Sequence, residues 1–399
     1  MPAPHLRDPV RGSVLLSAWF FALLVAVPCA VLVGTALVEW RRRRARRAGR
    51  SVRSGWQMAV VRALAVVLTL VSASAAALDG VNRHFEYIPS FAALFGQVSR
   101  DMVPASVARL ESRVGGAGPG NSVATPLPMP RHGAVEQVSI AGSVSGVAAR
   151  TGFVYLPKQY FDPARRGRRF PVLYLLHGSP GVAADWLRGA FVDQAMDSLI
   201  DAGAVAPFII VMPDVNGGYA RDTECQDIVS GPQVQTYLVR DVVDWVDAHY
   251  RTVTDRGARA IGGLSTGGYC ALNLVLRHQD RFSAIVSHSG TLDPIESAYS
   301  GRLWGGSRKL RAENSPSVYL PTIPIPAPIG VYLDAGAGDR DAIRAGRRAQ
   351  ALFRQRAVPV TFNVVRGEGH TFAAWRENLA LSLPWVSNWF KVHDPVADQ

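Results

Sequence analysis

Ser265 is the residue in this sequence best suited to act as a nucleophile. It lies in Gly263-Leu264-Ser265-Thr266-Gly267, which matches the pattern G-x-S-x-G. In that pattern the serine stands on a sharp turn between a strand and a helix, and the flanking glycines avoid clashes at the turn. The pattern alone is weak, since a chance match occurs in roughly one chain in ten of this length. The context strengthens it, because an apolar run precedes the motif and a helix-like run follows it.

A serine nucleophile needs a base, and the base needs an acid that orients it. In chains with this motif the acid and the histidine follow the serine in that order. Four histidines follow Ser265: His278, His288, His370 and His393. His370 stands in "RGEGHTFAAW", a loop between the last predicted strand and the last predicted helix, so we expect it to be the base.

The acid is expected in the stretch "YLDAGAGDRD", which offers three aspartates. Asp334 still belongs to the predicted strand, and Asp341 begins the next helix, where it can act as a cap. Asp339 lies at the tip of the intervening turn and is the favoured acid, with Asp334 and Asp341 as alternatives. One helix and one strand separate Asp339 from His370, which suits a pair that meets at one edge of a sheet.

An oxyanion hole requires two backbone N–H groups near the nucleophile. One is expected from Thr266, the residue after the serine, and the other from an early strand-to-loop turn. The stretch "LLHGSPG" at 175–181 is such a turn. Because Pro180 has no N–H, Ser179 is the predicted second donor, although a plain tight turn is the alternative interpretation.

The elements that must position these residues alternate between strands and helices. Helical patterns occur at 232–250, 267–278 and 341–357, and most of the apolar runs lack the alternation of a half-exposed strand. Such runs are typical of strands buried on both faces. We therefore predict an α/β domain over 134–392 with a mostly parallel, eight-stranded sheet flanked by helices. The predicted strands are 134–142, 151–157, 171–178, 207–214, 258–263, 282–290, 329–336 and 360–367.

The motifs "YLLHGSPG", "GLSTGG", "GAGD" and "GEGHTFAAW", in this order, resemble the Putative esterase branch of the α/β-hydrolases. That branch includes esterase D-like enzymes, feruloyl esterases and the mycobacterial antigen 85 mycolyltransferases. The resemblance covers about 135–392 and implies an α/β-hydrolase fold. It also implies a triad of Ser265, Asp339 and His370, with an oxyanion hole formed by Ser179 and Thr266. The antigen 85 proteins carry a glutamate as the acid, where this chain has an aspartate.

The segment before residue 80 has the pattern of two membrane helices. The stretch 13–39 contains a single charged residue, at its end, and 56–78 contains only Arg62. Each is long enough to cross a hydrocarbon core of about 30 Å. Between them lies the segment 41–53, which holds eight arginines and no acid and accounts for most of the net charge of +12.

An arginine-rich segment between two spans is expected on the cytoplasmic side. Both termini and the α/β domain would then be extracytoplasmic, and the protein would be a two-pass protein of the cell membrane. The small residues of "SASAAALDG" at 72–80 keep open the alternative that a signal peptidase cleaves the second segment. Binding to nucleic acid is disfavoured, because most of the excess of basic over acidic residues lies in the segment between the two spans.

Three further segments complete the predicted organisation. Residues 81–133 form a juxtamembrane segment that ends in a Gly/Pro-rich linker, and 393–399 form a charged tail. Residues 291–327 are a long insertion before the strand that precedes the acid. This insertion could cover the site as a lid or be a structural excursion.

Two of the three cysteines, Cys225 and Cys270, lie in the α/β domain, while Cys29 lies in the first apolar stretch. If the domain is outside the cell, Cys225 and Cys270 could form a disulfide, because disulfides persist there. Two separate buried thiols are the alternative.

The sequence thus predicts a membrane-anchored, extracytoplasmic serine esterase acting on an ester or acyl-lipid substrate. An acyltransferase that moves acyl groups to a sugar or lipid hydroxyl is the alternative, and a non-catalytic binding module is a minor one. Partners are expected to be the substrate and, through the N-terminal helices, the lipid bilayer. No cofactor, nucleotide or metal site is expected, because the sequence contains no phosphate-binding glycine motif and no H-E-x-x-H.

Overall fold

A computed structural model describes residue 10 and residues 12–50, 55–95, 102–103, 130–218 and 221–393. The chain divides into two compact units, one of Asp8–Gln97 and one that contains Val98–Gln399. Most of the predicted Gly/Pro linker and of the charged tail lies outside the described residues.

The larger unit is built on a mostly parallel sheet, as predicted. Its strand order is β1-β2-β3-β5-β4-β6-β7-β8-β9. β3 pairs in antiparallel fashion with β2 and β5, and all the other neighbours in the sheet are parallel. The strands are β1 (Met102–Val103), β2 (Ala134–Ile140), β3 (Arg150–Leu156), β4 (Val172–Leu176), β5 (Ile209–Met212), β6 (Arg259–Leu264), β7 (Ala284–His288), β8 (Gly330–Gly336) and β9 (Val360–Val365).

Each of the eight predicted strands is present, and the two-residue β1 adds a ninth at the edge beside β2. The residues of β4, β5, β6, β7 and β8 are buried throughout. Helices cover both faces of these strands, so an apolar side chain is favoured at every position and the alternation of a half-exposed strand is lost.

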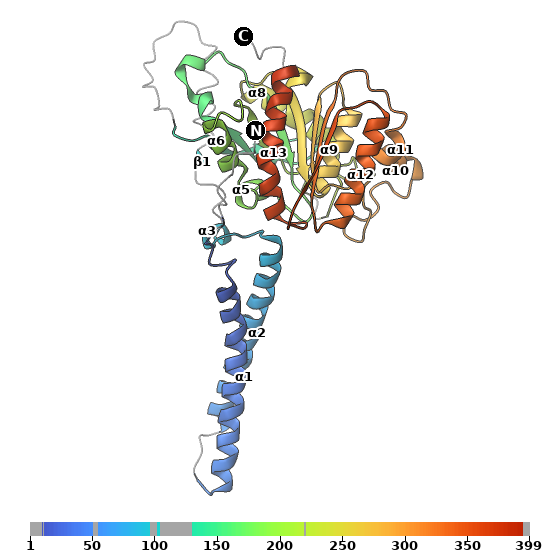
Figure 1. Cartoon of the computed structure of the whole chain (residues 1–399). Coiled ribbons are helices and arrows are strands. Elements are labelled where there is room, and N and C mark those ends of the chain that lie inside the picture. Colours follow the sequence, from blue (N-terminus) through green and yellow to red (C-terminus); the bar gives the residue numbers. More distant parts are fainter. Residues whose placement is uncertain are drawn as a thin grey trace. The chain divides into compact units, whose positions relative to one another are not determined.

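Helices α5, α6 and α13 lie on one side of the sheet, and α9 and α12 lie on the other (Figure 1). α9 follows β6 directly and is almost entirely buried, which explains why its sequence is apolar nearly all round. The α-helices of this unit are α5 (Asp185–Arg188), α6 (Val192–Asp201), α7 (Val234–Thr236), α8 (Val243–His249), α9 (Thr266–Arg277), α10 (Arg308–Glu313), α11 (Pro316–Tyr319), α12 (Arg340–Gln355) and α13 (Phe372–His393).

The helix predicted over 232–250 is interrupted. A π-helical stretch, Tyr237–Val242, separates α7 from α8. A π-turn contains an extra residue and so shifts the side chains that follow it around the helix. Within this stretch the carboxylate of Asp241 accepts hydrogen bonds from the N–H groups of Val144 and Ser145, at 2.7 and 3.0 Å. The π stretch is thereby tied to the turn between β2 and β3.

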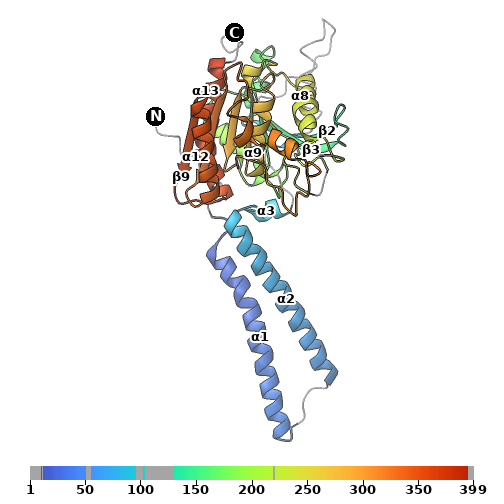
Figure 2. The ribbon, with the colours of Figure 1, turned by 90° about the vertical axis from the view of Figure 1, so that its right-hand side faces the viewer.

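The smaller unit is a helical hairpin of α1 (Ala18–Arg47) and α2 (Gly55–Phe85), followed by the short α3 (Phe91–Leu94) (Figure 2). Both long helices are long and apolar enough to cross a membrane by length and composition. α1 continues through Arg47, so most of the arginines predicted in a loop belong to a helix. Arginine and alanine are strong helix formers, which explains why the helix extends through this segment.

Candidate active site

Ser265 occupies a strained turn between β6 and α9. Its backbone has φ 55° and ψ −122°, in a region that residues with a side chain rarely adopt. The N–H of Ser265 donates to the carbonyl of His288, at 2.9 Å, which fixes the turn to the end of β7. Strain of this kind persists only where surrounding structure holds it, and it is concentrated at functional sites.

The glycines around Ser265 are required by contacts between backbone segments. A Cβ on Gly263 would lie 2.1 Å from the carbonyl oxygen of Gly267, and a Cβ on Gly267 would lie 2.2 Å from that of Leu176. A Cβ on Gly178 would stand 3.1 Å from the Cβ of Ser265. The turn at the end of β4 can therefore lie this close to the nucleophile because residue 178 has no side chain.

Ser265, His370 and Asp339 form a continuous hydrogen-bonded line. The Nε2 atom of His370 lies 2.9 Å from Oγ of Ser265, and its Nδ1 atom lies 2.6 Å from Oδ2 of Asp339. The three side chains come from the β6–α9, β9–α13 and β8–α12 connections, at the carboxyl ends of parallel strands, with β7 between β6 and β8. His370 is 39% exposed and Asp339 only 9%, so the base is open to solvent while the acid is covered.

Asp339 is held in its ionised form. Burial acts to raise the pKa of Asp339, but hydrogen bonds from His370 and from the N–H of Ala342 outweigh it and keep that pKa below the usual value. The bond from Ala342 exists because Asp339 is the N-cap of α12. An ionised acid on Nδ1 leaves Nε2 of His370 free to accept the proton of Ser265.

The two alternative acids have other partners. Asp334 lies 2.6 Å from Nδ1 of His288, and this pair is fully buried. Asp341 is 82% exposed and pairs with Arg344 on the surface of α12. Of the three aspartates considered from the sequence, only Asp339 contacts His370.

The N–H groups of the two predicted oxyanion donors are available to a ligand. Among the described residues, neither the N–H of Ser179 nor that of Thr266 has an acceptor. For Thr266 this follows from its position, because the first N–H groups of a helix lack partners within the helix. The short distance from Gly178 to Ser265 brings the turn that carries Ser179 beside the nucleophile.

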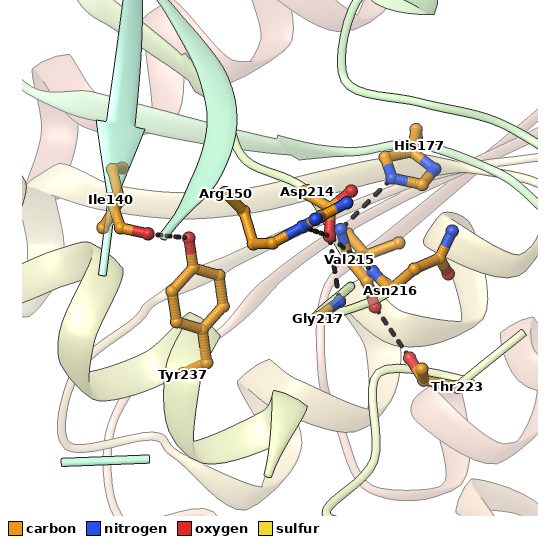
Figure 3. Close-up of polar contacts among 9 residues, drawn as sticks. All are labelled: Ile140, Arg150, His177, Asp214, Val215, Asn216, Gly217, Thr223 and Tyr237. Carbon is orange, nitrogen blue, oxygen red and sulfur yellow. Dashed lines mark hydrogen bonds and ion pairs between the residues drawn. The ribbon is translucent and has the colours of Figure 1, made fainter. Parts of the chain in front are cut away.

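His177 is a site residue that sequence reasoning missed. Its ring is fully buried, with Nδ1 2.8 Å from the carbonyl of Gly178 and Nε2 accepting from the N–H of Val215 at 3.1 Å (Figure 3). The ring therefore joins the turn at the end of β4 to the loop after β5. The histidine in "HGSPG" was a signal for such a role, but its partner could not be identified without the fold.

The loop after β5 is itself held by Asp214. Its Oδ1 accepts from the N–H groups of Asn216 and Gly217, at 3.1 and 2.9 Å, and from Nε of Arg150 at 3.4 Å (Figure 3). These bonds fix the segment that presents Val215 to His177. The oxyanion turn is thus supported by residues from β3 and from the β5 loop.

Cys225 and Cys270 form a disulfide in the structure. Cys270 lies in the second turn of α9, and Cys225 belongs to a buried segment that also approaches the elbow. In that segment Oδ2 of Asp222 accepts from the hydroxyl of Thr266 at 3.3 Å. The elbow is therefore supported on this side by one covalent bond and one side-chain hydrogen bond.

Glu224, next to the disulfide, is a buried acid. Burial and the neighbouring Asp222 carboxylate raise the pKa of Glu224 to about 8. Its Oε1 accepts from the N–H of Ile295 at 3.0 Å, which ties the insertion 291–327 to the disulfide segment. The carboxyl is therefore mostly neutral at pH 7.

The insertion is also fastened to α9 further along. The hydroxyl of Tyr269 donates to the carbonyl of Asn314 at 2.7 Å, and that of Tyr319 donates to Oδ1 of Asn273 at 2.7 Å. Both contacts are made by buried or half-buried groups on the helix that begins at the nucleophile. This part of the insertion is structural.

Two tryptophans near the site, Trp186 and Trp375, are both buried. Trp375 packs edge-on against His370, with ring centroids 5.2 Å apart, and Trp186 packs against His288 at 6.0 Å. Trp375 thus supports the base, whereas Trp186 contacts the buried pair. In the part of the chain that the structure describes, no group of three or more His, Cys, Asp or Glu side chains is arranged to hold a metal ion.

Known proteins share this arrangement of elements. The family model described as Putative esterase matches residues 147–386. The chain is 31% identical over 268 residues to a protein of Corynebacterium glutamicum, covering 64% of this chain and 62% of the relative. It is 27% identical to an endo-1,4-beta-xylanase/feruloyl esterase of Xylanibacter ruminicola, covering 63% of this chain and 31% of that protein.

A solved ferulic acid esterase aligns with a TM-score of 0.57 and 26% identity, over 66% of this chain and all of that structure. The chain spans less than two thirds of the length of the two curated relatives. The family model, in contrast, matches more than half of this chain, including β4, the serine elbow and the loop of His370. The chain has the α/β-hydrolase fold and belongs to the Putative esterase family.

Proposed function

We propose that this protein is a serine esterase that cleaves carboxylic esters through an acyl-enzyme. The observation that carries the proposal is the line from Ser265 through His370 to Asp339, with contacts of 2.9 and 2.6 Å. Membership of the esterase family and the likeness to a ferulic acid esterase support the same reaction class.

In the first half of the reaction, Oγ of Ser265 attacks the ester carbonyl carbon while Nε2 of His370 takes the hydroxyl proton. The carbonyl oxygen becomes an oxyanion, which the N–H groups of Ser179 and Thr266 stabilise. As the tetrahedral intermediate collapses, the bond to the leaving alcohol breaks and His370 returns the proton to that oxygen. The acyl group remains on Ser265.

In the second half, a water molecule takes the place of the alcohol. His370 accepts a proton from the water as its oxygen bonds to the acyl carbon, and the oxyanion forms again in the same position. Collapse breaks the bond to Ser265, which regains its proton from His370, and the carboxylic acid leaves. Asp339 remains ionised throughout and stabilises the imidazolium in both halves.

Labelling with a fluorophosphonate probe tests this proposal on the full chain in detergent micelles. Wild-type protein should be labelled at Ser265, and Ser265→Ala should abolish the labelling and the hydrolysis of a short acyl ester. Ser139→Ala is a matched control, because Ser139 is an exposed serine on β2. A well-folded wild-type protein that neither labels nor hydrolyses any ester would instead be a binding module.

The acyl acceptor is the second question, because an acyl-enzyme can react with a sugar or lipid hydroxyl as well as with water. The motifs shared with the antigen 85 mycolyltransferases favour testing this acyltransferase alternative. Product analysis with added trehalose or glycerol separates the two reactions. An esterase releases free acid at a rate that the sugar does not change, whereas an acyltransferase forms the acyl sugar.

We further propose that α1 and α2 anchor the protein in the cell membrane, with the α/β domain extracytoplasmic. The two apolar helices and the arginines that follow the first of them support this topology. The disulfide supports it too, because disulfides persist outside the cytoplasm. The proposed boundaries remain 1–80 for the hairpin, 81–133 for the connecting segment and 134–392 for the catalytic domain.

Cysteine accessibility in intact cells tests the topology. In a Cys29→Ser background, a cysteine introduced as Ala45→Cys should be protected from an impermeant maleimide. Ser139→Cys, on the exposed side of β2, should react in the same cells. Reaction at position 45 without reaction at position 139 would reverse the topology.

A further inference from the structure

A second histidine–aspartate pair lies next to the proposed triad. His288 ends β7 and Asp334 lies in β8, and the two residues are direct partners in the parallel register. Nδ1 of His288 is 2.6 Å from Oδ2 of Asp334, and the two side chains are 1% and 0% exposed. The mechanism proposed above makes no use of this pair.

Such a pair is expensive to bury. Removing a carboxylate from water carries a large desolvation cost, and an apolar pair of similar volume is often as stable or more stable. Burial raises the pKa of Asp334, and the contact with His288 opposes that change. Oδ1 of Asp334 and Nε2 of His288 also lack hydrogen-bond partners among the described residues. Stability alone therefore gives no reason for the pair.

The backbone of the same two residues bonds to the nucleophile turn and to Ser289. The carbonyl of His288 accepts the N–H of Ser265 at 2.9 Å, and the carbonyl of Asp334 accepts the N–H of Ser289 at 2.9 Å. Ser289 lies beside Asp339, where its hydroxyl contributes to the lowering of the pKa of that carboxyl. These contacts place the buried pair between the nucleophile turn and the residue that lies beside the acid.

His288 is not a second base. Its Nε2 has no hydroxyl or other hydrogen-bond partner among the described residues, and its ring packs against that of Trp186, with centroids 6.0 Å apart. The side-chain contact with Asp334 instead fixes the carboxyl ends of β7 and β8 relative to each other. Ser289, which has φ 51°, directly follows β7. The strained backbone at Ser265 is hydrogen-bonded to the carbonyl of His288 at the end of the same strand.

We propose that His288 and Asp334 are a positioning pair, which holds the nucleophile turn and the acid turn at their reactive separation. This inference rests on the proposed esterase function. A displacement of about 1 Å in such an arrangement can cost about 10²-fold in rate. Loss of the pair is therefore expected to lower kcat with little change in KM.

The central test replaces both residues with apolar ones, as His288→Leu together with Asp334→Leu in the full chain. We expect a thermal midpoint equal to or above that of the wild type, but a kcat and a fluorophosphonate labelling rate lowered about 10²-fold. His288→Asn should restore most of the rate, because the asparagine amide presents a donor near the Nδ1 position. Asp334→Asn, which keeps the shape of the side chain, gives the same test if the apolar variant does not fold.

A matched control is the pair of Arg259 and Asp247, which contact each other at the amino end of β6, the strand that carries Ser265. Its double substitution to leucine should alter stability and leave kcat within about threefold. Equal kcat in the His288/Asp334 variants and the wild type would overturn the proposal. So would a loss of kcat that follows the thermal midpoint and disappears at low temperature. Failure of the esterase proposal is a separate result, because the wild type would then show no labelling.

Discussion

The two histidine–aspartate pairs of this protein have the same length and different surroundings. His370–Asp339 and His288–Asp334 both have an Nδ1 to carboxylate distance of 2.6 Å. His370 is 39% exposed, and its Nε2 reaches Ser265, whereas His288 is 1% exposed and its ring packs against that of Trp186. A short contact to a carboxylate therefore does not identify a catalytic histidine.

The position of the pair in the sheet explains the difference. Asp334 and His288 lie within adjacent strands, so helices cover them on both faces. Asp339 and His370 lie in turns beyond the strand ends, where backbone can bend and solvent can enter. A histidine–aspartate pair thus transfers protons in the loops beyond the carboxyl ends of the strands. Within the strands, as we propose, a second such pair aligns those loops.

Replacement of the half-exposed base should have the largest effect. His370→Ala is expected to lower kcat by about 10⁶-fold, because Ser265 then has no group to accept its proton. The thermal midpoint should change little, since the side chain is partly open to solvent. Steady-state kinetics and a thermal scan measure both. A residual rate within tenfold of the wild type would mean that another residue is the base.

Asp339→Asn should reduce kcat by about 10⁴-fold, because an amide donor on Nδ1 selects the wrong tautomer of His370. Asp341→Asn is the matched control, being two residues away and 82% exposed, and should leave kcat within twofold. An equal loss in both variants would point to a general effect of charge near α12 rather than to the acid of the triad.

The disulfide stabilises the side of the elbow that carries Thr266. Cys225→Ser with Cys270→Ser opens a cross-link between residues 45 apart in sequence and is expected to cost about 2–4 kcal/mol of unfolding free energy. Urea denaturation measures the change. An unchanged midpoint would show that packing alone holds the segment.

Glu224 is a buried acid that, unlike Asp334 and Asp339, contacts no histidine among the described residues. Because its pKa in the folded protein is about 8, above the usual 4.5, the folded state binds the extra proton between these values. Stability should therefore fall as pH rises from about 5 to about 8, by up to about 1.4 kcal/mol per pH unit. Above pH 8 the penalty is complete, and below about pH 4.5 it is absent.

Glu224→Gln removes this titration and keeps an acceptor for the N–H of Ile295. Thermal midpoints measured from pH 5 to 8 should fall less steeply in this variant than in the wild type. Parallel curves for the two proteins would contradict a neutral Glu224 carboxyl.

Patterns that follow from local physics were predictable from the sequence. The eight strands could be found because buried strands produce apolar runs, and the order of Ser265, Asp339 and His370 followed from the motif and its elements. The contact between His288 and Asp334 could not be found, because it depends on the register of two strands that are far apart in the chain. The two-residue β1 and the partner of His177 were beyond reach for the same reason.

The cross-link at the elbow also has a consequence for how the protein matures. Cys225 and Cys270 are thiols when the chain is synthesised, and they join only in an oxidising compartment. Under the topology proposed here, the fold beside the nucleophile is completed only after export. Enzyme retained in the cytoplasm is then expected to be less stable around Cys225 and more readily degraded. The oxidation state of the two cysteines would therefore distinguish exported protein from protein that has not left the cytoplasm.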